Sequence, residues 1–496
     1  MNPLKQLAGQ TAVYGVSSIL GRLVNYLLVP IHVYTFVAEQ YGEVANLYAF
    51  AAILLVFLTY GMETAFFRYF NTTGKSPKVF STALISIFST TLLFVWLIVL
   101  QRNTIAELLN VAENPRYITW FALIVGMDAL VAIPFARLRA INKAARFAMI
   151  KLLNILLNVS LNLFFIFAVP WIALNGSPWM QQLVAHIYDG EVVIAYIFAA
   201  NIIASMIQLM VFVPSLFRYK LQFDVALWRK MIVYALPLLL LSMAGTINQT
   251  IDRLLLTWLL PAGVSMAQVG IYAACFKIPI IMYFFLQAFR YAAEPFFFAH
   301  ATIDKARNIF PVVMDAFVTL SALIFLGTML FLDDLFIYFV DEGYREGKKI
   351  VPVVIFAFVF QGIGFNLSMW YKLTNKTIYG AWLALAGTAV IVVVNVVGIP
   401  HFGYMASAWA FFLANLLIMT LSYWLGQRHF PVPYNVLTNL IRLAGAVGVY
   451  YASTFITVQN LWLRLTLYAL LFLAYALLLI RKKHVRLYME NRNDPV

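Results

Sequence analysis

The chain has 496 residues, of which 63% are apolar and only 11% are charged. A soluble domain carries about 25% charged residues, so this chain has too few charges to cover a surface in water. The net charge of +14 therefore does not indicate a nucleic-acid-binding protein, and a polytopic membrane protein is the class that remains. A single cysteine, Cys275, excludes a disulfide framework and a cysteine-based metal site.

Hydropathy predicts an all-α membrane protein of about 14 spanning helices, because each span needs about 20 mostly apolar residues. No small-residue cleavage site follows the first span, so we expect that span to be retained. The predicted spans are 10–36, 44–66, 79–101, 117–138, 147–170, 191–217, 231–260, 269–289, 309–331, 350–371, 378–399, 404–426, 439–457 and 461–480.

The basic residues of the loops predict the orientation, since Lys and Arg favour the cytoplasmic side. With the N-terminus inside, the two tails and the even-numbered loops hold 25 of the 34 basic residues, and the other loops hold 6. The remaining 3 lie inside spans. This distribution predicts two cytoplasmic termini and explains the positive net charge by topology, without nucleic acid.

Spans 1–6 and 7–12 repeat each other weakly. Six spans are an even number, so the halves share one orientation, which predicts two parallel lobes related by an axis along the membrane normal. We expect lobes at 1–220 and 221–430, followed by helices 13 and 14 with a basic cytoplasmic tail at 431–496. The matched segments are 21–30 with 252–261, 41–42 with 269–270, 67–69 with 289–291, 142–143 with 375–376, and Asn162 with Asn395.

Three basic residues inside spans are candidates for binding substrate, because each costs about 2.5–3.5 kcal/mol to insert. Arg22 and its repeat partner Arg253 would face a central cleft and hold a phosphate, which the guanidinium fork binds bidentately. Lys277 would add a third positive charge. The alternatives are that Arg253 or Lys277 pairs with Asp252, and that Arg22 caps carbonyls or snorkels to the membrane surface.

Acidic residues inside spans suit coupling to a proton or a sodium ion. Asp128 in the fourth span and Asp252 in the seventh are the candidates for ion coupling. The alternative for Asp128 is an ion pair with Arg22. Asp315 is an acid near a helix end, and a position in solvent is the alternative for it.

Two acid–base pairs lie at predicted cytoplasmic helix ends, Glu63 with Arg68 and Arg290 with Glu294. They would form a gate whose salt bridges break when the lobes rock. The alternative is that all four are ordinary charges of the membrane interface.

Asn154, Asn158 and Asn162 share one face of the fifth span, since their spacing is i, i+4, i+8. They would form a hydrated wall that contacts sugar hydroxyls, or else they would hydrogen-bond to other helices. His32, near the end of the first span, is predicted to be structural.

Several chemistries have no candidate residues in the sequence. It contains no Walker A motif, no zinc-type cluster and no outside loop with paired carboxylates, so we expect no metal site, no catalytic residues and no cofactor beyond a coupling H⁺ or Na⁺. A membrane enzyme of glycan assembly remains an alternative function, although the short outside loops disfavour it.

The same residues resemble a known family. The chain is similar to the Wzx-type O-antigen flippases of the multidrug/oligosaccharidyl-lipid/polysaccharide (MOP) exporter superfamily. The segments that carry the likeness are Gly21-Arg22, Leu27-Leu28-Val29-Pro30, Glu39-Gln40-Tyr41-Gly42, Gly61-Met62-Glu63, Phe67-Arg68-Tyr69-Phe70, Asn395, Ile399-Pro400, Phe402-Gly403-Tyr404 and Ala406 with Ala408.

This resemblance implies a MOP-type fold and a flippase that works by alternating access, driven by an ion or the membrane potential and not by ATP. Its cargo would be an undecaprenyl-pyrophosphate-linked oligosaccharide of O-antigen, capsule or exopolysaccharide, moved across the bacterial inner membrane. Membrane lipids, a polysaccharide polymerase and glycosyltransferases are the expected partners.

Two transporters of the same fold are the alternatives. One is an ion-coupled multidrug or cation exporter, but three bases against two acids at mid-membrane favour an anionic cargo. The other is a lipid II flippase, which is expected to carry a second Arg-Asp motif where this chain has Leu23, Val24 and Asn25 after Arg22.

Overall fold

The computed structural model describes residues 24, 26–73, 76–188, 190–216, 222–299, 303–374, 376, 378–456, 458 and 460–481, and the regular structure within them is helical. The α-helices are α2 (Leu28–Thr35), α3 (Ala38–Thr59), α4 (Met62–Thr72), α5 (Pro77–Leu100), α6 (Arg102–Leu108), α7 (Arg116–Ala140), α8 (Ala144–Leu163), α9 (Val169–Asn175), α10 (Pro178–Val184), α11 (Ala195–Leu216), α12 (Val225–Leu259), α13 (Ala262–Cys275), α14 (Ile280–Ala299), α15 (Ile303–Leu330), α16 (Leu332–Phe339), α17 (Ile350–Leu367), α18 (Met369–Leu373), α19 (Ile378–Phe402), α20 (Tyr404–His429), α21 (Val436–Thr454) and α22 (Leu461–Arg481). A π-helical turn at Phe164–Ala168 joins α8 to α9, and a 3₁₀-helix at Glu342–Lys349 precedes α17.

The chain is a multi-pass membrane protein. Within the described ranges, 11 helical segments are long and apolar enough to cross a membrane, or 12 if α13 and α14 form one broken span. The predicted count of fourteen is not confirmed. The first predicted span, 10–36, lies largely outside the described residues, and the thirteenth, 439–457, coincides with α21, which carries Asn439 and Arg442 and is not among the apolar segments.

The predicted span 269–289 is interrupted, because α13 ends at Cys275 and α14 begins at Ile280. Pro279 explains the break: a proline lacks the amide hydrogen and disfavours the helical conformation of the residue before it. Within the break, the Ile280 amide donates to the Lys277 carbonyl over 3.2 Å in a turn. Lys277 therefore lies in this break and not in the middle of a helix as the sequence predicted.

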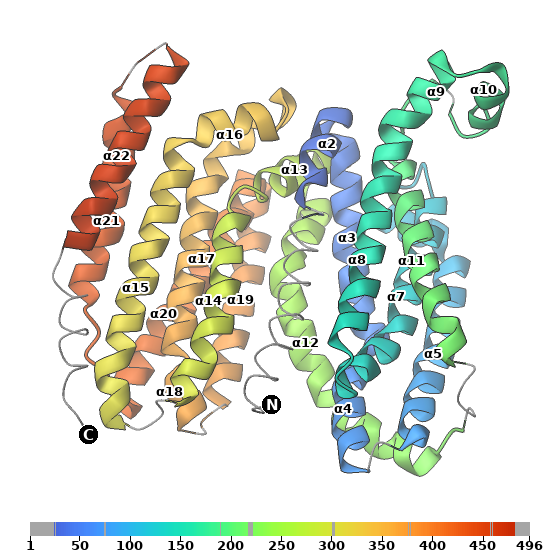
Figure 1. Cartoon of the computed structure of the whole chain (residues 1–496), viewed down its shortest axis with the longest axis horizontal. Helices are drawn as coiled ribbons and strands as arrows, with labels where there is room; N and C mark the ends of the chain where they lie inside the picture. The colour runs from blue at the N-terminus through green and yellow to red at the C-terminus, as the bar shows by residue number, and fades with distance from the viewer. Residues whose placement is uncertain are drawn as a thin grey trace. The chain divides into compact units, whose positions relative to one another are not determined.

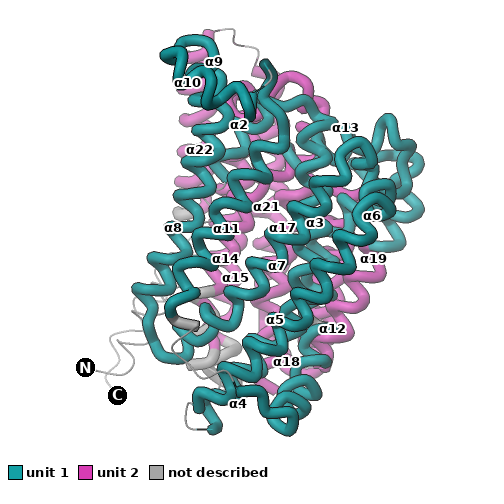
Figure 2. Tube along the Cα trace, turned by 90° about the vertical axis from the view of Figure 1, so that its right-hand side faces the viewer, with its two compact units in different colours: residues 1–274, 392–406 teal, residues 275–391, 407–496 magenta. Residues whose placement is uncertain are grey.

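The chain forms two compact units, shown in different colours in Figure 2. Unit 1 comprises 1–274 and 392–406. In it α3, α5, α7, α11 and α12 pack side by side (Figure 1), around a core that includes Phe66, Phe80 and Phe198. Because α12 and most of α13 pack in unit 1, this division differs from the lobes at 1–220 and 221–430, which follow the sequence repeat and stay a prediction.

Unit 2 comprises 275–391 and 407–496. Here α15 is the central helix, since α14, α17, α21 and α22 all contact it (Figure 1). The added helices α21 and α22 are therefore an integral part of this unit.

A buried polar network holds α21 against α15. The Asp315 carboxylate accepts hydrogen bonds from Asn435 and Asn439, each over 2.9 Å, and lies 3.7 Å from the Arg442 guanidinium. The Tyr475 hydroxyl of α22 donates to the Arg442 carbonyl. Asp315 is 8% exposed, so the alternative of a solvated position is wrong: the partners that bury it come from α21, more than a hundred residues away.

Two glycines from the repeat, Gly42 and Gly270, meet at a crossing of α3 and α13 within unit 1. A Cβ atom added to Gly42 would lie 1.9 Å from the Met266 carbonyl oxygen, and one added to Gly270 would lie 1.9 Å from the Ala38 carbonyl oxygen. The contact is thus reciprocal, and its members are related by the same sequence offset. It agrees with the predicted equivalence of 41–42 and 269–270.

The substitution Gly42→Ala is expected to lower the Tm of the purified protein, because the added methyl group would push the α3 and α13 backbones apart. Such overpacking costs about 1–3 kcal/mol. The matched control is Gly263→Ala, also in α13, where an added Cβ meets nothing within 4 Å and alanine improves helix propensity. Equal Tm values for the two variants would contradict the tight crossing.

The Asp315 network gives a second prediction. Arg442→Leu should lower the Tm, since removing one member of a buried pair costs about 3–5 kcal/mol. The double variant Asp315→Asn/Arg442→Leu should recover part of that loss, because no uncompensated charge remains. A double variant no more stable than Arg442→Leu would show that the pair does not act as a unit.

Candidate functional site

Asp128 in α7 is half-buried and accepts a hydrogen bond from a neighbouring helix. The Ser205 hydroxyl of α11 donates to the carboxylate over 3.1 Å, and Ser205 is 2% exposed. Asn201, one turn earlier in α11, lies 3.4 Å from Ser205 and donates to the Tyr48 hydroxyl of α3 over 2.7 Å. A membrane-helix carboxylate whose hydrogen-bond donor is a neutral hydroxyl is a candidate to take up a proton or a small cation.

Lys151 is the charged group that interacts with Asp128. It lies two turns inside α8, with its ammonium 4.7 Å from the centre of the Phe135 ring. Its other electrostatic partners are Glu63 and Arg139. This lysine was not among the site residues predicted from the sequence. The missed signal was its position inside the predicted span 147–170.

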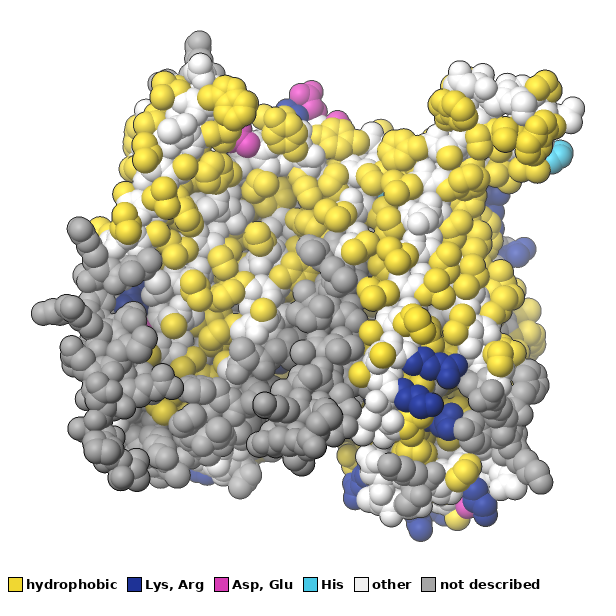
Figure 3. Space-filling model, in the orientation of Figure 1, with side chains coloured by type: hydrophobic (Ala, Val, Ile, Leu, Met, Phe, Trp, Pro, Cys, Tyr) yellow, Lys and Arg dark blue, Asp and Glu magenta, His cyan; other side chains and the backbone are white. Residues whose placement is uncertain are grey.

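Lys and Arg side chains gather over the lower end of α8 on the face of unit 1 in Figure 3, next to a broad apolar surface. Glu63 of α4 forms a 2.5 Å ion pair with Arg139 of α7. Its predicted partner Arg68 instead places its guanidinium 4.4 Å from the centre of the Tyr234 ring. Glu63 and Arg68 are therefore near each other in sequence but are held by different helices, and their role as a gate stays a prediction.

Arg253 of α12 lies in a polar site of its own. Its guanidinium is 3.1 Å from Asp252, donates to the Gln249 carbonyl over 2.8 Å and lies 5.6 Å from the centre of the Tyr272 ring. Both charged side chains are nearly buried, at 14% and 13% exposure. The pairing with Asp252 is thus present. The predicted repeat partner Arg22 lies outside the described residues, and the cargo-binding and coupling roles stay predictions.

The asparagine stripe of α8 splits into two parts. Asn162 is 1% exposed and accepts a 3.0 Å hydrogen bond from the His32 ring of α2. It also donates to the Asn158 carbonyl and side-chain oxygens, over 2.8 and 3.1 Å. The end of the stripe that carries Asn158 and Asn162 therefore joins helices, as the alternative predicted. Asn154, at the other end of the stripe, is only half-buried, so it is the asparagine that suits contact with a sugar.

The remaining predicted site residues belong to unit 2. Lys277 is half-buried in the break between α13 and α14. Arg290 of α14 is exposed, with its guanidinium 5.0 Å from the centre of the Phe365 ring. The side chain of Glu294 lies outside the described residues, so the second predicted gate pair stays a prediction.

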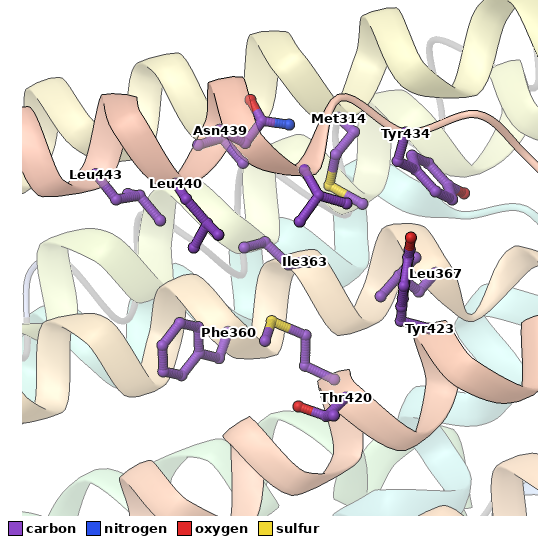
Figure 4. Close-up of a pocket in the computed structure, with 13 residues that line it drawn as sticks. Met314, Phe360, Ile363, Leu367, Thr420, Tyr423, Tyr434, Asn439, Leu440 and Leu443 are labelled. Carbon is purple, nitrogen blue, oxygen red and sulfur yellow. The ribbon is translucent and has the colours of Figure 1, made fainter. Parts of the chain in front are cut away.

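Unit 2 also contains a half-open pocket of about 180 Å³ between α15, α17, α20 and α21. In Figure 4, Leu440 and Leu443 of α21 point across it toward Phe360 and Ile363 of α17. Tyr434 lies at one end. The lining is almost wholly apolar, so this pocket suits a hydrocarbon chain and not a sugar or a phosphate. Among the described residues, no group of three His, Cys, Asp or Glu side chains could hold a metal ion.

Residues 7–298 match the family described as polysaccharide biosynthesis protein. A search of curated proteins finds no match. Among solved structures, the chain is similar to the lipid II flippase MurJ in an inward closed conformation, with 13% identity and a TM-score of 0.67. That alignment covers 94% of this chain and 98% of MurJ.

Two further structures share the fold. One is an inward-facing multidrug resistance MATE family transporter of the MOP superfamily, with 13% identity, a TM-score of 0.61 and coverage of 88% of this chain and 96% of that one. The other is a MOP superfamily transporter from Pyrococcus furiosus described by a binding pocket of reverse polarity, with 14% identity, a TM-score of 0.56 and coverage of 85% and 95%.

These similar proteins are transporters and flippases, which agrees with the prediction that the chain is not an enzyme. Their identities are low, so the likeness concerns the fold. The family match covers more than half of the sequence. The chain therefore belongs to the polysaccharide biosynthesis protein family and has the fold of the MOP exporter superfamily.

Proposed function

We propose that this protein flips a lipid-linked oligosaccharide across the bacterial inner membrane. The cargo is an undecaprenyl-pyrophosphate-linked repeat unit of O-antigen, capsule or exopolysaccharide, moved from the cytoplasmic to the outer leaflet. The observation that carries the proposal is the presence of basic side chains, Arg253 and Lys151, inside membrane helices of a chain from a polysaccharide biosynthesis family. Such costly charges are retained where they bind an ion or a substrate.

The charges of unit 1 support an anionic headgroup over a cationic drug. Arg253 offers a guanidinium that suits a pyrophosphate, and the bases near α8 outnumber the acids around them. A cation exporter would instead need acids and aromatic faces directed at its cargo. The apolar pocket of unit 2 supports a cargo with a hydrocarbon tail, since it could hold part of an isoprenoid chain while the headgroup binds elsewhere.

The cycle proposed here is alternating access driven by a cation or by the membrane potential. Asp128 binds and releases the coupling H⁺ or Na⁺, and Asp252 is the second acid assigned to coupling. The gate residues Glu63, Arg68, Arg290 and Glu294 change partners as the protein opens. Both termini lie in the cytoplasm, and the polymerase and glycosyltransferases act before and after the flipping step.

The direct test is transport in proteoliposomes. Purified protein is reconstituted with a fluorescent undecaprenyl-pyrophosphate oligosaccharide, and a membrane-impermeant quencher reports the fraction in the outer leaflet over time. Parallel vesicles carry lipid II or a cationic dye. Flipping of the oligosaccharide supports the proposal, whereas transport of only lipid II or only the dye would replace it by one of the two alternatives.

Arg253→Ala is expected to reduce surface polysaccharide at least tenfold in a strain that lacks its own flippase, because a charge-assisted contact to pyrophosphate is worth about 1.5–3 kcal/mol. Arg253→Lys should recover part of the output, since it keeps the charge but loses the bidentate fork. The control is Arg229→Ala, at the exposed start of the same helix. Wild-type output from Arg253→Ala, with equal protein in the membrane, would rule out this role.

A further inference from the structure

Lys151 is a base of the membrane helices to which the proposed function assigns no specific contact with the cargo. Its helix α8 is apolar enough to cross the membrane as part of Ala144–Asn175. The side chain lies over the Phe135 ring and is otherwise exposed on the surface of unit 1. A lysine side chain on the surface of the unit can reach a bound anion, and the charges around it set how strongly it binds that anion.

Four groups interact with either Lys151 or Asp128. On the acid side, α11 supplies the neutral Ser205, and α3 supplies Tyr48, which also interacts with the Asp128 charge. On the base side, Glu63 of α4 and Arg139 of α7 interact with the ammonium.

Glu63 and Arg139 compensate each other at 2.5 Å. The negative charge that balances Lys151 is therefore chiefly that of Asp128. Phe135, over which the ammonium lies, is two helical turns from Asp128 on the same face of α7, so the acid and the base lie along one side of this helix.

This balance links two binding events. In a medium of low dielectric constant, an ammonium is attracted both to the carboxylate and to any phosphate that approaches. A proton or a sodium ion that neutralises Asp128 removes the negative charge that offsets the Lys151 ammonium. The attraction between the protein and the phosphate then becomes stronger. Thermodynamic linkage requires the reverse as well: a phosphate bound at Lys151 favours the cation at Asp128.

We propose that Lys151 binds a phosphate of the cargo and that a monovalent cation at Asp128, either H⁺ or Na⁺, strengthens this binding. The inference rests on the proposed function, because it requires an anionic headgroup. It adds a residue to the headgroup site and gives the sign of the coupling. Cation and cargo bind together, whereas an exporter that exchanges a cation for a cationic drug would show competition between them.

The test measures the Kd of farnesyl pyrophosphate for the full-length protein in nanodiscs, with farnesol as the uncharged control. One series compares low with high pH without sodium, and another exchanges sodium for choline at constant ionic strength, so the two series distinguish H⁺ from Na⁺. Asp128→Asn provides the reference that cancels the titration of the probe itself. Lys143→Gln, at the residue just before α8, is the matched control.

The wild type should bind the probe at least about fivefold more tightly, relative to Asp128→Asn, when H⁺ or Na⁺ is added, a typical size for coupled sites. Asp128→Asn should bind tightly under all conditions. Lys151→Gln should bind weakly and without cation dependence, Lys151→Arg should keep both properties, and Lys143→Gln should behave as the wild type. Tm values establish that each variant is folded.

Two results would overturn the inference in different ways. If the wild type binds the probe and neither Lys151→Gln nor Asp128→Asn changes its affinity or its cation dependence, the role of Lys151 is wrong and the proposed function stands. If the wild type binds farnesyl pyrophosphate no better than farnesol under any condition, the anionic headgroup itself is wrong, and the inference fails with the proposed function.

Discussion

The cost of placing a charge in hydrocarbon organises the polar part of this protein. Asp128, Asp252 and Asp315 lie inside its described membrane helices, and each interacts with a base: Lys151, Arg253 and Arg442 respectively. Each pair serves a different purpose. The pair at Asp315 is enclosed by two asparagines and joins helices, the pair at Asp252 is nearly buried, and Lys151, which interacts with Asp128, has an exposed side chain. The more completely a pair is enclosed, the less of its charge is available to a ligand.

The helices and the membrane class were predictable because they depend on local hydropathy. The partners of the charges were not, since Lys151 lies far from Glu63 in the sequence, and Arg442 lies 127 residues from Asp315. Lys151 and Arg442 were not among the predicted site residues, although they lie inside the predicted spans 147–170 and 439–457. The asparagine spacing predicted a shared helix face correctly, but only the contact with His32 shows that Asn162 has a structural role. Arg22 stays a prediction throughout.

The fold by itself does not separate a flippase from a drug exporter, because structures of both kinds align with this chain at similar, low identity. Function must be argued from the site. Here the relevant contrast is between the charged side chains inside unit 1 and the apolar pocket inside unit 2. The first environment suits an anionic group, and the second, taken by itself, suits a hydrocarbon chain.

The crossing of Gly42 and Gly270 has a mechanical consequence. Two helices that interlock through large side chains must unlock before they can turn. At this crossing the backbones touch directly, with a carbonyl oxygen 1.9 Å from each missing Cβ position. A contact of this kind resists compression but contains no interlocking side chains. Rotation of α3 against α13 about this point would therefore not require side chains to separate, while the distance between the helices would stay fixed. The pivot of such a rotation would then be formed by Gly42 and Gly270, two residues that have no side chain.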